Sequence, residues 1–511
     1  MTTITITGEH IRLDVLRDVF RGPVTVELAP SALENLERAH KVIIDAIERG
    51  DVVYAVNTGY GKLADRRISP DDLLELQRRS VLSHMVGVGD PLPDAIVRGI
   101  MVIKLIGLCR GHSGLRVEVA QRMVDMINAD ALPVIPAQGS VGASGDLAPL
   151  AYMAGALMGE GRVRVDGTTY SAREGLAKAG LEPIVLGPKE CAALINGVQA
   201  STAIAVNGLF GAEAVLNAGL AGGALTLEAT AGRPGVLDDR IQQIRGHVGQ
   251  IRVAAALRDL VADSPVLGIE FEGRRLQDPY CLRCQPQVMG AALDLLAFAA
   301  VTLETEVNAV SDNPLMFPDD DVVLSGGNFH GQPVAYAADI IALALCEIGS
   351  ISERRQAMLM DSSMSGLPPF LVGNAGLNGG FMMAQVTSAA LVAENRAKAT
   401  PNSVDSIPTS AGQEDHVSMA MHASVRLGAM VRNAAYVVAI ELLCAAQGLD
   451  LRNDGDAAPG NKPTYELVRG IAARLVDDRI LSEEMEAVAA RILDGAFVER
   501  VGIAVAPGAA G

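Results

Sequence analysis

The chain has 511 residues, 49% of them hydrophobic, and carries 42 basic against 60 acidic side chains, a net charge of −18. This length and composition indicate a soluble globular protein with a large buried core. The negative balance argues against nucleic acid or an anionic membrane as a partner, because both need a basic surface, whereas a small amino acid is compatible with it.

The N-terminal part of the chain mixes short strands with helices. Residues 4–7 and 24–28 have strand patterns, and a helix is expected from Pro30, after which apolar residues recur on one face. Residues 51–56 read as a further strand or an extended segment, and Ser69-Pro70 opens another helix. A small hairpin is expected at residues 163–170.

Long segments rich in Ala, Leu and Val dominate the rest of the chain and predict bundle helices. Their approximate bounds are 189–230, 286–310, 332–361, 381–399, 415–447 and 463–494. Many of these segments are uncharged over several turns, so they should be covered by one another or by further subunits. We therefore expect a homo-oligomer. The predicted fold class is mainly α with a long-helix bundle core. Residues 1–190 are expected to form a small mixed α/β N-terminal region that carries the Ala-Ser-Gly loop, and residues 191–511 a central long-helix bundle and a C-terminal helical region.

The location of the protein is expected to be cytoplasmic. No basic segment followed by an apolar run begins the chain, so secretion is not expected. Six cysteines in a chain of this length do not make a disulfide framework. Cys191–Ala212 is the one transmembrane suspect, but interrupting polar residues and the lack of a basic flank favour a buried core helix.

The tripeptide Ala143-Ser144-Gly145 can build an electrophile from its own backbone. If the Gly145 nitrogen reaches the Ala143 carbonyl carbon, ring closure and loss of two waters convert Ser144 into a methylidene-imidazolone with an electron-poor alkene. Glycine accepts strained dihedrals, alanine hinders little, and serine has a hydroxyl to eliminate. Asp146 is expected to cap a helix beginning at Leu147, beside the ring. Taken alone, the tripeptide is also the pattern of an ordinary loop before an N-cap.

Two other motifs suggest cofactors that their surroundings do not support. Residues 59–64 match the GxGxxA dinucleotide pattern, but no long apolar helix follows and no second strand ends in an acidic residue about twenty residues on. Cys281 and Cys284 lack the second pair or nearby histidines of a zinc site. We therefore expect neither a nucleotide nor a metal.

Three strings resemble signatures of the histidine, phenylalanine and tyrosine ammonia-lyases, and the chain is identified as a member of this family. They are residues 139–150 around the tripeptide, 54–61 and 277–287, and the resemblance runs from about Val24 to Arg452. It implies 4-methylidene-imidazol-5-one formed from Ala143-Ser144-Gly145 as cofactor. It also implies a largely helical fold and a homotetramer whose active sites combine loops from several subunits.

The resemblance also assigns roles to individual residues. A bidentate guanidinium suits an amino acid carboxylate, so Arg283 is the carboxylate clamp. An ionised Tyr54 is a strong enough base for a β-proton if neighbouring positive charge stabilises it. Asn196 lies in an uncharged helical segment, where a buried amide must find a partner or serve a ligand. The predicted catalytic residues are Tyr54, Ala143, Ser144, Gly145 and Tyr280, and the predicted substrate-binding residues are His84, Asn196, Gln277, Arg283, Phe329, Met382 and Glu414.

Two positions favour histidine as the substrate. Glu414 stands in Gln-Glu-Asp-His, where phenylalanine enzymes tend to carry glutamine, and Ser83-His84 resembles the histidine enzymes. By local rules alone, Glu414 and Asp415 would simply favour the start of a helix. The departures from the family pattern are Tyr60, Lys62, Cys281 and Gly412.

The expected reaction is deamination of L-histidine to urocanate and ammonia. The alternatives are a tyrosine or phenylalanine ammonia-lyase, or an aminomutase that returns the ammonia to the β-carbon. A non-catalytic helical scaffold is a more distant alternative.

Overall fold

The computed structural model describes residues 2–268 and 276–505. The chain divides into two compact units, each built from three stretches. The first unit contains Met1–Asn207, Ala300–Asp339 and Pro401–Val425, and the second contains Gly208–Ala299, Ile340–Thr400 and Arg426–Gly511. The borders after residues 207, 299, 339 and 425 fall inside helices. This division differs from the expected one at residue 190, which stays a prediction.

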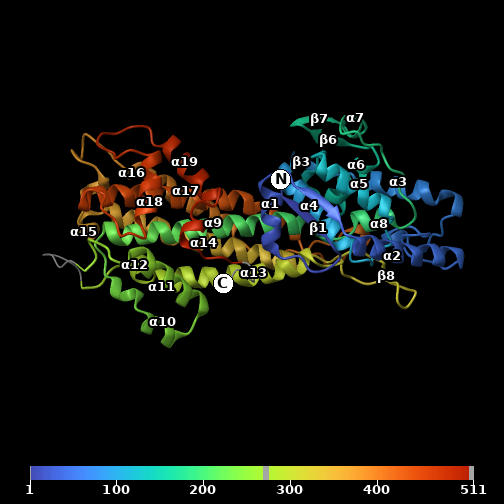
Figure 1. Ribbon diagram of the computed structural model, residues 1–511, viewed down its shortest axis with the longest axis horizontal. Coiled ribbons are helices and arrows are strands. Elements are labelled where there is room, and N and C mark those ends of the chain that lie inside the picture. Colours follow the sequence, from blue (N-terminus) through green and yellow to red (C-terminus); the bar gives the residue numbers. More distant parts are fainter. Residues whose placement is uncertain (1, 269–275, 506–511) are drawn as a thin grey trace. The chain divides into compact units, whose positions relative to one another are not determined.

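The chain is mainly helical with several long helices, as the sequence predicts (Figure 1). Its α-helices in chain order are α1 (Arg17–Arg21), α2 (Pro30–Glu48), α3 (Leu73–His84), α4 (Asp94–Leu108), α5 (Val117–Asn128), α6 (Leu147–Leu157), α7 (Ala172–Lys178), α8 (Glu190–Ile195), α9 (Gln199–Ala229), α10 (Asp239–Arg245), α11 (Val248–Val261), α12 (Tyr280–Arg283), α13 (Gln285–Val307), α14 (Gln332–Met360), α15 (Ser362–Ser365), α16 (Met382–Lys398), α17 (Ala420–Asn453), α18 (Lys462–Ile471), α19 (Ser482–Leu493) and α20 (Val498–Val501).

The strands form small separate sheets in the first unit. A parallel pair joins β1 (Thr3–Ile6) to β2 (Thr25–Leu28), with Thr3 opposite Thr25. The other sheets are antiparallel: β3 (Val88–Pro91) with β5 (Pro136–Gln138), β4 (Leu132–Pro133) with β6 (Arg162–Val165) and β7 (Thr168–Ser171), and β8 (Leu315–Phe317) with β9 (Val322–Leu324). The expected strands near residues 4–7 and 24–28 and the hairpin near 163–170 are confirmed.

Of the two alternatives for residues 51–56, the strand is wrong. Residues 54–56 form a turn in which Ala55 has φ 59°, and local side chains replace a strand ladder. Asn57 Oδ1 accepts the Val53 N–H at 2.9 Å, and Thr58 Oγ1 accepts the Ala55 N–H at 3.1 Å. Because Asn and Thr side chains satisfy these donors, the backbone needs no partner strand. A 3₁₀ turn at Gly61–Leu63 follows instead of a βαβ unit.

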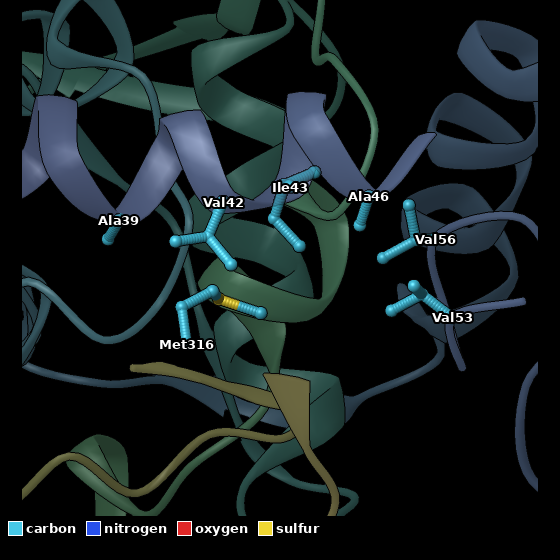
Figure 2. Packing of buried hydrophobic residues seen from close by; sticks show 7 residues of the cluster. All are labelled: Ala39, Val42, Ile43, Ala46, Val53, Val56 and Met316. Carbon is cyan, nitrogen blue, oxygen red and sulfur yellow. The ribbon is translucent and has the colours of Figure 1, made fainter. Parts of the chain in front are cut away.

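A hydrophobic cluster fixes this turn against α2 (Figure 2). Val42 and Ile43 on α2 pack with Met316 on β8, and Val53 and Val56 join the same buried group. Both valines flank Tyr54, so burial of their side chains holds the tyrosine segment in place.

In the second unit, long helices pack closely through small residues. A Cβ added to Gly219 on α9 would lie 3.2 Å from Met289 on α13, 3.3 Å from Ile348 on α14 and 3.8 Å from Val438 on α17. Four helices therefore converge at this glycine, which agrees with the bundle that their Ala- and Gly-rich composition predicts.

Two predicted long helices are interrupted. The segment 189–230 splits into α8 and α9 because Asn196 is extended, with φ −87° and ψ 138°, and Gly197 has φ 119°. The segment 463–494 splits into α18 and α19. Between these two helices, Asp478 accepts the Gly379 N–H at 2.7 Å and the Gly380 N–H at 2.9 Å. The segment that joins α18 to α19 therefore binds the loop before α16.

Within residues 2–268 and 276–505, four helices, α9, α13, α14 and α17, are long and apolar enough to cross a membrane by length and composition alone. The sequence pattern indicates only Cys191–Ala212, which contains the start of α9. The most apolar windows of α9 and α17 are 83% and 89% buried within the protein, which accounts for their composition. The corresponding window of α13 is only 44% buried.

Candidate functional site

The Ala143-Ser144-Gly145 loop rests on the break between α8 and α9. Gly145 forms a parallel β-bridge with Gly197, and the Asp146 N–H donates to the Gly197 carbonyl at 2.7 Å. Gly145 has φ 76°, and a Cβ there would overlap the Gly197 backbone. Only glycine fits this close approach of two backbones.

Asn196 directly contacts this loop. The sequence predicts that Asn196 lies within a helix, but the residue is the extended C-terminal end of α8, because the helical segment breaks there. Its Nδ2 donates to the Ser144 carbonyl at 2.7 Å, so this largely buried amide has found a partner in the tripeptide itself.

Asp146 caps a different helix from the expected one. It precedes α6, but its side chain makes no capping bond there. Instead Oδ2 accepts the backbone N–H of Ser201 at 2.7 Å and its hydroxyl at 2.8 Å, in the first turn of α9. Burial raises the pKa of Asp146, and hydrogen bonds from Ser201 and Ser140 oppose that rise. The buried carboxyl group therefore ties the tripeptide loop to α9.

Glu414 contacts Ser144 from the other side. Ser144 Oγ donates to Glu414 Oε1 at 2.7 Å, while Thr409 and Ser410 donate to Oε2 at 2.6 and 2.8 Å. Burial disfavours the ionised carboxyl group, but these three hydrogen bonds outweigh it and lower the pKa of Glu414. Glu414 does not begin a helix, because α17 starts only at Ala420.

His84 and Tyr54 approach the same carboxylate region. His84 ends α3, and its Nδ1 lies 2.7 Å from the Ser80 carbonyl, which can only accept, so Nδ1 carries a proton. The charge of His84 contributes to lowering the pKa of Glu414. The Tyr54 hydroxyl oxygen accepts the Gly61 N–H at 2.9 Å. The turn Gly61–Leu63 packs against the turn Ser410–Gly412, and thus the tyrosine segment lies beside the Glu414 loop.

The Phe329 loop is joined to the segment after Glu414. The ring of His330 stacks on His416, with centroids 5.8 Å apart. Two further hydrogen bonds tie this segment to the tripeptide loop: Ser418 Oγ donates to the Gly142 carbonyl at 3.0 Å, and the Met419 N–H donates to Val141 at 2.8 Å. Sequence reasoning missed Ser418, which carried no motif of its own.

Gln277, Tyr280, Arg283 and Met382 belong to the second unit. Arg283 Nη1 donates to Gln277 Oε1 at 2.5 Å, and its guanidinium lies 6.0 Å from the Tyr280 ring centroid. Met382 begins α16 and lines a cavity of about 500 Å³. The structure thus groups Gln277, Tyr280 and Arg283, while Tyr54, His84, Ser144, Asn196, Phe329 and Glu414 belong to the first unit.

The residues of the tripeptide loop fit the predicted ring. The Gly145–Gly197 contact and the amide on the Ser144 carbonyl form a cradle that a larger side chain would fill. No group of three or more His, Cys, Asp or Glu side chains within residues 2–268 and 276–505 could hold a metal ion. Cys281 and Cys284 are free thiols, and burial raises the pKa of Cys281, which makes it a poorer ligand and nucleophile.

The fold is mainly helical, and the cluster around Ser144 gathers several of the predicted site residues on loops at helix ends. Residues 11–470 match the model of the family described as aromatic amino acid lyase. The chain is 52% identical to a histidine ammonia-lyase of Paracidovorax citrulli over 96% of this chain and 95% of that protein. The chain belongs to the aromatic amino acid lyase family.

Solved structures show the same fold. The crystal structure of histidine ammonia-lyase from Trypanosoma cruzi is similar with a TM-score of 0.91 and 36% identity, covering 99% of this chain and 96% of that one. The tyrosine aminomutase from Streptomyces globisporus is similar with a TM-score of 0.94 and 32% identity, covering 98% of each chain.

Proposed function

We propose that this enzyme deaminates L-histidine to urocanate and ammonia, with methylidene-imidazolone formed from Ala143-Ser144-Gly145 as its electrophile. The observation that supports this most is the contact between Ser144 Oγ and Glu414 Oε1. It puts an ionised carboxylate beside the reactive serine, where an imidazole N–H can donate to it and a phenyl ring cannot. The similarity to a histidine ammonia-lyase over nearly the whole chain points the same way.

Each predicted residue has a task in this reaction. The ring supplies an electron-poor alkene that makes the substrate amine a leaving group. Tyr54 takes the β-proton as the C–N bond breaks, and the electron pair of the C–H bond forms the new double bond. Arg283 binds the carboxylate, and Glu414 with His84 orients the imidazole.

The remaining predicted residues position the substrate and the ring. Asn196 holds the Ser144 carbonyl. Gln277 and Tyr280 order the amine, and Phe329 and Met382 line the pocket.

We further propose a cytoplasmic homotetramer with shared active sites and a mixed α/β region in residues 1–190. Two features support the assembly. Tyr280, a predicted catalytic residue, is 74% exposed in one chain. On α13, Phe298 and Val301 lie about one helical turn apart and are 59% and 56% exposed, and adjacent exposed apolar side chains are typical of a surface that another copy covers.

Shared sites predict complementation between inactive chains. Ser144→Ala and Arg283→Ala homotetramers should each be inactive, because one lacks the electrophile and the other lacks the carboxylate clamp. Co-expressed as tagged mixed tetramers, the two chains should recover up to about a quarter of wild-type activity, since some sites then draw only intact residues. Activity of mixed tetramers that stays at the level of the separate variants would contradict sharing.

The substrate assignment predicts a specific effect of Glu414→Gln. The kcat/KM for histidine should fall by about 10²-fold, the scale of one lost charge-assisted hydrogen bond. Turnover would be followed by absorbance of the unsaturated acid with histidine, tyrosine and phenylalanine. The control is Asp415→Asn, which removes the same charge from the exposed neighbouring residue. Equal losses in the two variants, or a wild type that prefers phenylalanine, would refute the assignment.

A tyrosine or phenylalanine lyase, or an aminomutase, is the second candidate. The similarity in fold to a tyrosine aminomutase favours it. In the same assay with the three amino acids, this second candidate predicts turnover of tyrosine or phenylalanine, or formation of a β-amino acid.

A further inference from the structure

Lys104 is a buried amine that the proposed reaction does not use. It lies on α4 within the apolar run Ile100–Leu108 and is 2% exposed. Burial lowers its pKa to about 7, while the charge of Asp312 opposes this and that of Lys189 adds to it. A buried amine is costly unless its hydrogen bonds are made, so its partners indicate its role.

Those partners are the two sides of the α8–α9 break. Lys104 Nζ donates to the Asn196 carbonyl at 2.6 Å and to Gln199 Oε1 at 3.4 Å. Asn196 ends α8 and Gln199 is the first residue of α9, so one amine joins both helix ends. Gln199 is fixed further by Ser311, whose hydroxyl oxygen accepts its Nε2 at 2.9 Å.

The same break is the surface on which the tripeptide rests. Asn196 Nδ2 holds the Ser144 carbonyl, and Gly197 pairs with Gly145. Lys104 is therefore two hydrogen bonds from the tripeptide, through the backbone carbonyl and the side chain of Asn196. The hydrogen bonds of Lys104 go to Asn196 and Gln199 and not to the tripeptide or the Glu414 loop, so its influence passes through the break.

We propose that Lys104 is a positioning residue for ring closure, because it holds the Asn196–Gln199 break in the shape that folds Gly145 back toward Ala143. This inference rests on the proposed function. In the step concerned, the Gly145 nitrogen bonds to the Ala143 carbonyl carbon. The carbonyl oxygen leaves as water with the hydrogens of the Gly145 and Ser144 nitrogens. The Ser144 hydroxyl leaves with the Cα hydrogen as the second water, and no oxidant is needed.

Lys104 acts through its hydrogen bonds rather than through its charge. A neutral amine still donates N–H, so the contact with Asn196 survives deprotonation. Lys104→Met keeps the length and fills the apolar surroundings but removes the donor. Closure of a ring depends steeply on the distance between the reacting atoms, so a small shift of the break should slow it by about tenfold or more.

The test measures ring closure directly. Chains made by brief cell-free synthesis are sampled over time, and intact mass gives the fraction that has lost two waters. Lys104→Met should close about tenfold more slowly than wild type, and its turnover per closed ring should stay within about twofold. The control is Lys189→Met, a buried lysine whose side chain pairs with Asp312 at 2.8 Å instead of Asn196. Melting temperature and elution volume check that each variant folds, and Lys104→Leu replaces the methionine variant if that one does not.

Normal closure in a folded Lys104 variant, or equal slowing in Lys189→Met, would overturn the inference and leave the proposed function standing. A wild type that never loses two waters would overturn both.

Discussion

Replacement of Ser144 by alanine should lower histidine turnover by on the order of 10³-fold or more, the scale seen when a residue that acts covalently is removed. Alanine has no hydroxyl to eliminate, so the alkene cannot form. Intact mass should show the loss of two waters in wild type and no loss in the variant. The fold should survive, because Glu414 keeps its donors Thr409 and Ser410, and the lost bond costs about 1 kcal/mol.

Ser410→Ala is the matched control for this experiment. It also removes a hydroxyl donor from Glu414, yet it leaves the tripeptide intact. It should therefore lose two waters normally and fall by less than about tenfold in activity. Substantial turnover by folded Ser144→Ala would exclude a serine-derived electrophile.

Replacement of Tyr54 by phenylalanine should lower kcat by about 10²- to 10⁴-fold, the usual contribution of a general base. KM should change little, because the phenol hydroxyl acts on the β-proton rather than in binding. The fold should also change little, since the Gly61 N–H that now donates to Tyr54 lies on an exposed turn where water can replace the phenol. Steady-state kinetics with histidine would measure both constants.

Tyr60→Phe provides the comparison. The Tyr60 ring packs edge-on against Tyr54, with centroids 6.4 Å apart, and its hydroxyl donates to the Ala55 carbonyl at 3.3 Å. Tyr60→Phe keeps the ring and removes only the hydroxyl, at a position outside the predicted catalytic set, so this variant should keep most activity. Similar kcat values for the two variants would show that Tyr54 is not the base.

The sequence predicts most of the long helices and the family correctly, because apolar periodicity and contiguous motifs are local signals. Prediction from the sequence fails where a side chain forms hydrogen bonds with backbone groups far along the chain. Asp146 has the position of a cap for α6, but its bonds go to Ser201, more than fifty residues away. Asn196 has helical neighbours in sequence, yet its side-chain amide donates to the Ser144 carbonyl and α8 stops at this residue. No local pattern records such partners.

Lys104 illustrates a signal that was present but carried no motif. A single lysine in the run Ile100–Leu108 has to be satisfied by something buried, and that expectation is available from the sequence. The identity of its partners, Asn196 and Gln199, cannot be predicted from the sequence, because it depends on how α4 packs against the α8–α9 break.

The placement of the unit borders inside α9, α13, α14 and α17 limits how this protein can be divided or recombined. Neither unit is a contiguous stretch of chain, and a cut at any of these borders would sever a helix instead of a linker. The two units therefore cannot be handled as interchangeable modules. A chimera between two related enzymes would preserve folding better if its crossover points fell in surface loops than if they followed the borders of the units.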